Sequence, residues 1–180
     1  MKTLLNILNL SASLLVVIMI GAVPSQAQEA ISALKNHDTS QPIDISADRM
    51  EVRQNENIAL LIGKVQAIQG NMTFTAERVT VYYEVAEGAS KPTIARLDAT
   101  GQFKLVSPTE VAEGSWGVYD VKQRLVTMGG AVKLTRNENI ITADRLVLDL
   151  ETGVTNFDGR QDNGRVQGRF AVPNKNPNQE

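Results

Sequence analysis

Apolar and polar residues alternate one by one along several short segments of the chain. The alternation is clearest at residues 43–46, 50–53, 79–82, 103–105, 132–134 and 146–150. Because successive side chains of a strand point to opposite faces, these segments predict strands with one buried and one solvated face. Short runs rich in Asn, Gly and Glu predict tight turns between them, at 55–57, 69–71, 136–139 and 152–153. The pattern predicts an all-β chain of antiparallel hairpins.

A short motif recurs at a constant spacing. Residues 76–81 (Ala-Glu-Arg-Val-Thr-Val) return as 143–148 (Ala-Asp-Arg-Leu-Val-Leu), and Gly63 returns as Gly130, so both offsets are 67 (143 − 76 and 130 − 63). A repeat of this kind is typical of one supersecondary unit stacked several times, which favours a scaffold with a continuous surface or groove. The repeated glycines predict bulges or bends in the strands.

The first 27 residues have the organisation of a secretory signal peptide. Lys2 gives a positive start, residues 14–20 are all apolar, and Ser25-Gln26-Ala27 predicts cleavage after Ala27. The alternative is an uncleaved anchor, but the apolar stretch is shorter than the roughly 20 residues that span a bilayer. We expect residues 28–40 to form a flexible leader, 41–172 the β-domain and 173–180 a disordered tail.

The composition argues against several classes of function. Without Lys2 the chain has 17 basic and 20 acidic residues (18 − 1 against 20), so it offers no basic field for a nucleic acid. It has no cysteine, and its single histidine, His37, lies in the leader. A histidine-based triad or metal cluster therefore cannot be assembled, and phosphate-loop and dinucleotide fingerprints are absent. We expect a protein that is not an enzyme and that uses no cofactor and no metal.

Three segments carry a resemblance to a known family. Residues 41–45 (Gln-Pro-Ile-Asp-Ile), 63–70 (Gly-Lys-Val-Gln-Ala-Ile-Gln-Gly) and 75–79 (Thr-Ala-Glu-Arg-Val) resemble the periplasmic bridge protein of lipopolysaccharide transport, the LptA/OstA family. The resemblance implies a twisted open β-jellyroll (OstA-like), in which two facing antiparallel sheets built from repeated hairpins enclose a hydrophobic trough. It also implies a periplasmic location, lipopolysaccharide as the cargo, and end-to-end links to an inner-membrane receptor and an outer-membrane translocon.

The candidate lipid-binding residues come from two sources. The resemblance places groove-lining positions at Ile43, Ile45, Phe103, Tyr119 and Val121. The alternating pattern adds inward-facing positions at Val65, Phe74, Leu134, Ile141 and Leu148. All of these side chains would also face inward in a β-sandwich with a closed core, and Tyr119 could be a core aromatic whose hydroxyl is satisfied within the protein.

Open sheets leave strand edges that can pair with another chain. Here the candidate edges are residues 41–46 and 165–170, and joining unlike ends would build a head-to-tail oligomer. The sequence leaves two alternatives to a bridge: a membrane-tethered, receptor-like member of the same machinery, and a structural β-repeat protein that transports nothing. Arg49, Arg78 and Arg145 each follow an acidic residue, which predicts cross-strand charge pairs on the solvated face.

Overall fold

The structure is a computed structural model of the chain. It describes residues 34–35, 37–85, 88, 91–159 and 164–172. The expected signal peptide (1–27), the expected tail (173–180) and much of the leader therefore lie outside the described residues. Within the described ranges, no helix is long and apolar enough to cross a membrane.

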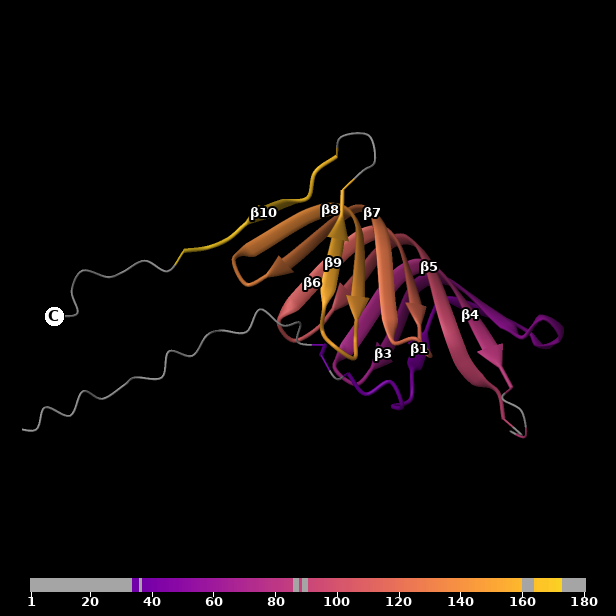
Figure 1. Ribbon diagram of the computed structural model, residues 1–180. Coiled ribbons are helices and arrows are strands. Elements are labelled where there is room, and N and C mark those ends of the chain that lie inside the picture. Colours follow the sequence, from indigo (N-terminus) through magenta and orange to yellow (C-terminus); the bar gives the residue numbers. More distant parts are fainter. Residues whose placement is uncertain (1–33, 36, 86–87, 89–90, 160–163, 173–180) are drawn as a thin grey trace, which may run out of the picture.

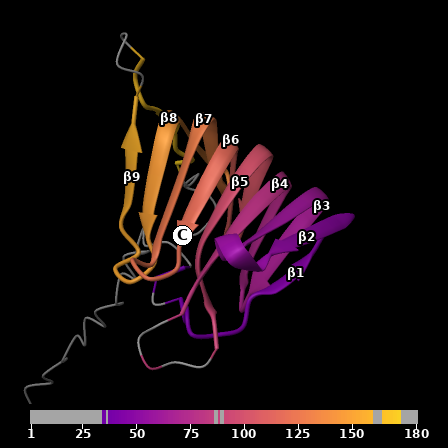
Figure 2. The same ribbon diagram turned by 90° about the vertical axis from the view of Figure 1, so that its right-hand side faces the viewer.

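Ten strands form one sheet in the described residues, and one turn of 3-10 helix, η1 (Gln54–Glu56), follows the second strand. The strands are β1 (Asp44–Ser46), β2 (Arg49–Arg53), β3 (Ile58–Gln69), β4 (Met72–Glu84), β5 (Thr93–Val106), β6 (Glu110–Asp120), β7 (Leu125–Arg136), β8 (Asn139–Asp149), β9 (Thr155–Asp158) and β10 (Gln167–Arg169). From β3 to β8 each strand pairs with the next one along the chain, and every pairing is antiparallel. Figure 2 shows this order as a steady change of colour from indigo β1 to yellow β9.

Three of the long strands, β3, β5 and β7, each carry a bulge near the middle. In β3 the register with β4 shifts between Ile62 and Val65, where Gly63 and Lys64 have φ of 81° and 45°. The same pair of positive φ values recurs in β5 at Gly101 and in β7 at Gly130, each with the residue that follows it. Two residues of these strands oppose one residue of the neighbour, which kinks the sheet and increases its twist. The repeated glycines are therefore bulge residues, as their spacing predicts.

The three bulges and the residues that lie opposite them on the neighbouring segments form one line across the sheet, which we call the bend. It consists of residues 47–48, 63–64, 76–77, 101–102, 114–115, 130–131 and 143–144. The bend divides the sheet into two layers. The first layer begins with β1 and finishes with β10, whereas the second begins with β2 and finishes with β9. The strongly bent sheet is visible in Figure 1.

The sheet does not close on itself. In the described residues β1 and β2 pair only with β3, and β9 and β10 pair only with β8, so each end of the sheet has a free strand edge. The predicted open β-jellyroll is confirmed in these terms. The side opposite the bend, which we call the mouth, is where hairpin turns of the two layers approach each other.

The bulges also keep the apolar side chains inside. Along β4, buried residues alternate with less buried ones until Glu77 and Arg78, two consecutive exposed residues at the bend. The alternation then resumes at Val79 with the phase that again points apolar side chains inward. Without this interruption the period of two would turn the second half of the strand inside out. The buried residues of both layers consequently belong to one hydrophobic cluster.

Candidate functional site

All ten residues predicted to line a groove lie on the inner face. Val65, Phe74, Phe103, Tyr119, Leu134 and Leu148 are buried, and Ile43, Ile45, Val121 and Ile141 are partly buried against the same cluster. They come from both layers: Ile43 and Val121 flank β1 and β6, and the other eight lie in β1 and in β3 to β8. The structure thus brings the whole predicted set together, while their contact with lipid stays a prediction.

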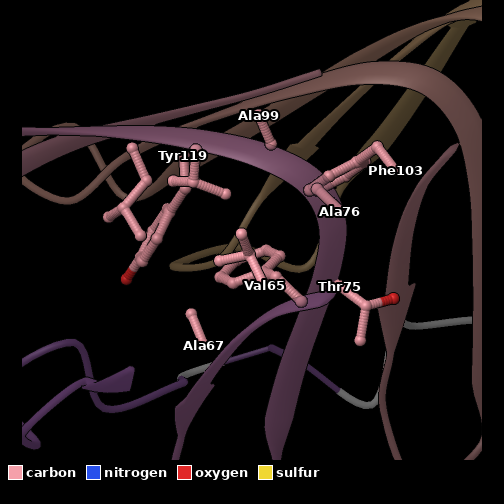
Figure 3. A pocket seen from close by; sticks show the side chains of 10 residues that line it. Val65, Ala67, Thr75, Ala76, Ala99, Phe103 and Tyr119 are labelled. Atoms are coloured by element: carbon pink, nitrogen blue, oxygen red, sulfur yellow. The ribbon is translucent and has the colours of Figure 1, made fainter. Parts of the chain in front are cut away.

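Three aromatic rings connect the layers near the centre of this face. The Phe74 ring of the first layer lies 5.3 Å from the Tyr119 ring of the second, centroid to centroid, and 5.7 Å from the Phe103 ring. Gly117 makes room for them, since a Cβ there would lie 2.4 Å from Cε1 of Phe103. Figure 3 shows Tyr119 and Val65 reaching into the same space, with the Thr75 hydroxyl directed away from it.

The layers are in contact and leave little space between them. The cavity beside the aromatic rings has a volume of about 10 Å³ and is lined by residues that include Val65, Phe74 and Tyr119. A second cavity, also of about 10 Å³, lies among aliphatic residues nearer the mouth. Each has room for about one water molecule. The sheet is open at its edges, but the trough between its layers is filled by side chains, because apolar faces without a guest pack on each other.

A buried polar network ties the layers together at the mouth. The Tyr119 hydroxyl donates a hydrogen bond of 2.8 Å to Oε1 of Gln69, which lies in the other layer and is only 1% exposed. Gln69 Nε2 in turn donates to the backbone carbonyls of Thr39 and Gln41, at 3.0 and 2.9 Å. Burial raises the pKa of Tyr119 well above its usual range, so the hydroxyl keeps its proton and acts as the donor.

One of these acceptors, Thr39, belongs to the segment predicted to be a flexible leader (28–40), and the other, Gln41, is the first residue of the predicted β-domain. We call the described residues 34, 35 and 37–41 the strap. Its His37 places Nε2 3.2 Å from Gln69 Oε1 and Nδ1 3.2 Å from Asn71 Oδ1. Its Leu34 is 1% exposed and lines the cavity near the mouth. Sequence reasoning missed this contact, and its only signal was the short, largely apolar run at residues 30–34 of the leader.

A second buried polar group lies beside Leu34. Arg136 donates a hydrogen bond from its guanidinium to the Glu110 carboxylate, which is only 7% exposed. Within the described residues, the buried Oγ of Ser107 and the buried Nε of Arg136 make no hydrogen bond. Ser107 and Glu110 both line the same cavity as Leu34. This corner of the mouth therefore combines an aliphatic pocket with unused hydrogen-bond donors.

The outer face carries exposed charge pairs. Arg145 of β8 lies 3.6 Å from Asp158 of β9, so the predicted cross-strand pairing is confirmed at this position. Arg49 instead pairs along its own strand, with Glu51 at 3.8 Å. Among the described residues, no group of His, Cys, Asp or Glu is arranged to hold a metal ion.

Comparison with known proteins agrees with this geometry. An uncharacterized protein of Rhizobium meliloti (strain 1021) is 30% identical over 131 residues, which cover 71% of this chain and 69% of that protein. The crystal structure of LptH, the LptA homologous periplasmic component of the lipopolysaccharide transport device of Pseudomonas aeruginosa, has the same fold. It superimposes with a TM-score of 0.63 at 20% identity, over 75% of this chain and 99% of LptH.

The family comparison is more specific. Residues 44–154 match the model of the LptA/(LptD N-terminal domain) lipopolysaccharide transport proteins, which is more than half of the chain. This family carries lipopolysaccharide without catalysing a reaction, in agreement with the absence of catalytic motifs from the sequence. The chain belongs to the LptA/(LptD N-terminal domain) family of lipopolysaccharide transport proteins.

Proposed function

We propose that the protein is a periplasmic carrier that binds the acyl chains of lipopolysaccharide between its two layers. In this function it passes the lipid from the inner to the outer membrane as part of the transport machinery. The observation that carries the proposal is the continuous inner face, which is apolar from the β1 and β2 end of the sheet to the β8 end. Such a surface can shield an acyl chain from water along the whole length of the sheet.

The energy of burial explains why a carrier needs this surface. Each methylene group that leaves water contributes about 0.8 kcal/mol, so several acyl chains exposed together would cost tens of kcal/mol. The layers are joined covalently at the bend, whereas the described contacts between them at the mouth are made by side chains, so we infer that the mouth is where they can separate. The cavity at the aromatic rings, between Phe74 and Tyr119, marks where an acyl chain would begin to part them.

The two free edges of the sheet suit end-to-end assembly. At one edge Met50 and Val52 of β2 are 54% and 58% exposed, and at the other Val166 and Phe170, which flank β10, are 42% and 65% exposed. Unpaired edges with exposed apolar side chains recruit further strands. We infer that these edges bind the inner-membrane receptor, the outer-membrane translocon and further copies of the chain, head to tail, which would continue the groove from one molecule to the next.

The packed interior favours a second candidate, a structural β-repeat protein with a closed core. Two cavities of about 10 Å³ are typical of a filled core and would not admit an acyl chain without movement. The two candidates differ in one respect that can be measured. A carrier admits lipid between its layers, whereas a closed core does not.

Photo-crosslinking separates these candidates. A benzophenone amino acid is introduced at Phe74 or Tyr119 on the inner face, and at Tyr82, which is 39% exposed, as an aromatic control. After irradiation with purified lipopolysaccharide, we expect an adduct from the two inner positions and not from Tyr82. Failure of both inner positions in folded protein would reject the carrier and leave the closed core.

A further inference from the structure

The strap places an aliphatic side chain where the proposed function requires a lipid. Leu34 is 1% exposed and shares its cavity with Leu105, Ala112, Leu134, Leu146 and Leu148. These residues come from both layers, so Leu34 is inserted between them. The contacts of a buried leucine side chain with such walls are the contacts that a segment of acyl chain would make.

The rim of this cavity has hydrogen-bonding capacity that the protein leaves unused. Ser107 is 8% exposed, and its buried Oγ has no hydrogen-bond partner among the described residues. The buried Nε of Arg136 also makes no hydrogen bond among the described residues, although another nitrogen of its guanidinium binds Glu110. Buried polar groups are normally satisfied, so the unused Ser107 hydroxyl at the cavity indicates a missing partner. An oxygen of an ester, a hydroxyl or a phosphate would accept from it.

The strap is attached in a way that permits it to leave. Its described hydrogen bonds to the sheet run to Gln69 and Asn71, and Gln69 also accepts from Tyr119 of the aromatic cluster. The strap adds no strand of its own: its residues precede β1, which begins at Asp44. The Leu34 end can therefore leave the cavity without loss of any strand pairing.

We propose that Leu34 holds the place of an acyl chain, and that a lipid entering at the mouth displaces the strap and presents an oxygen to Ser107. This inference rests on the proposed lipid-carrying function. It identifies the ligand of this corner as an acyl chain joined to a hydrogen-bond acceptor. It also makes the strap an internal competitor, which keeps the groove filled until lipid arrives.

The absence of cysteine from the chain allows a direct test. The variant Leu34→Cys carries one thiol in place of a side chain that is 1% exposed, and its reaction with a water-soluble maleimide reports release of the strap. We expect slow labelling without lipid and labelling at least about tenfold faster with saturating lipopolysaccharide, because a cavity-bound thiol reacts only while it is exposed. Ser40→Cys, on the exposed part of the strap, should label fast in both conditions.

The control at the wall of the cavity gives the opposite result. Leu148→Cys replaces a side chain that is 3% exposed in the same cavity. Lipid that replaces the strap should leave this thiol protected. Lipid binding itself is measured separately, by native mass spectrometry of the unlabelled protein. If lipid binds while Leu34→Cys stays protected, the strap proposal is overturned and the carrier function stands; if no lipid binds, the proposed function has failed.

Affinity provides a second test. A ligand that competes with an internal plug binds only the molecules whose cavity is free. Its apparent Kd is therefore the intrinsic Kd divided by the fraction of molecules from which the plug has left. Leu34→Ala should therefore bind a dansyl-labelled undecanoic acid several-fold more tightly than the unaltered chain. Ser107→Ala should bind the same probe several-fold more weakly, because it removes a donor. Unchanged or weaker binding by Leu34→Ala, with an unaltered circular dichroism spectrum, would contradict displacement.

Discussion

The bend and the mouth of the folded sheet are built on different principles. At the bend, three strands repeat one device, a glycine with φ of 79° to 81° followed by a second residue with positive φ. At the mouth, single contacts such as the Tyr119–Gln69 hydrogen bond join residues 50 positions apart, and the described part of the chain shows no second copy of this bond. The bend is a repeated, local structure, whereas the mouth is unique and depends on long-range contacts.

This difference suits a carrier that must keep its shape while it opens. The bend is enclosed by its neighbours: a Cβ on Gly63 would lie 2.5 Å from Oδ2 of Asp48, and one on Gly130 would lie 2.6 Å from Oγ of Ser115. The mouth is held by a few hydrogen bonds and by the packing of Leu34. Hydrogen bonds of this kind contribute about 1 kcal/mol each, so the larger cost of separating the layers is the apolar surface that is exposed, and an acyl chain entering between them would cover that surface again.

The largest effect is expected from adding a methyl group at the bend. Gly101 has φ of 79°, and its Cβ would lie 2.8 Å from Cβ of Glu77. Gly101→Ala should lower the free energy of unfolding by about 2–4 kcal/mol, because backbone strain and overpacking add. Urea denaturation measures the change.

Gly88 is the matched control for this substitution. It has the same φ of 79°, but a Cβ there would have no atom within 4 Å. Gly88→Ala should therefore cost only the backbone term, about 1–2 kcal/mol. Equal losses for the two variants would show that the close approach at the bend has no energetic weight.

A smaller effect is expected at the mouth. Tyr119→Phe removes the donor to Gln69 while it keeps the ring beside Phe74, and should lower the free energy of unfolding by about 1 kcal/mol. The same variant should take up an acyl probe faster, because one tie between the layers is gone. Tyr83→Phe, which changes a half-buried tyrosine whose hydroxyl has no hydrogen bond among the described residues, should alter neither stability nor uptake. A Tyr119→Phe variant with unchanged uptake would argue that the network does not hold the mouth.

The raised pKa of Tyr119 predicts how the stability of the protein depends on pH. Its folded-state pKa is raised by burial, whereas a tyrosine in the unfolded chain ionises near pH 10. The unfolded state therefore loses this proton first as the pH rises. The contribution of protonated Tyr119 to the free energy of unfolding is complete below about pH 10 and falls as the pH rises further. The loss should reach about 1 kcal/mol by pH 11. Between pH 8 and about 11, the free energy of unfolding should decline less steeply in Tyr119→Phe than in the unaltered chain. Parallel curves for the two proteins would contradict the raised pKa of Tyr119.

The smallest effect is expected beside the bend, on the outer face. Arg145 and Asp158 are 3.6 Å apart, with side chains 53% and 58% exposed. An ion pair exposed to this degree contributes about 0–1 kcal/mol, and salt screens it. Arg145→Ala should change the free energy of unfolding by no more than about 0.5 kcal/mol, and less in high salt. A larger loss would mean that the pair supports the bend in a way its exposure does not suggest.

The bend could be predicted from the sequence because its rules are local. The glycine spacing at Gly63, Gly101 and Gly130 indicates bulges, and the period of two selects the inner face on both sides of each bulge. Even the residues that face each other across the layers, such as Phe74 and Tyr119, fall on the predicted face. Strand alternation predicts this face for Phe74, whereas Tyr119 is placed on it by the family resemblance.

The mouth could not be predicted because its contacts join residues that are far apart in the sequence. Gln69 appears in the sequence as a turn residue, yet it is 1% exposed because it bonds to Tyr119 and to the strap. Leu34 lies in a polar segment without a strand pattern, and only the three-dimensional approach of β5 to β8 creates its cavity. Side-chain packing between the layers also hides the trough, since a sequence pattern cannot distinguish a groove from a core.

The central claim is that the layers part at the mouth to receive acyl chains while the bend stays fixed. Lys122 and Glu138 lie in the exposed turns just before and after β7, one at the tip of each layer, and β7 is bent at Gly130. Spin labels on the double variant Lys122→Cys/Glu138→Cys report their separation by pulsed electron resonance. The account predicts a longer distance when lipopolysaccharide is bound, and an unchanged distance in protein shown to carry lipid would contradict it.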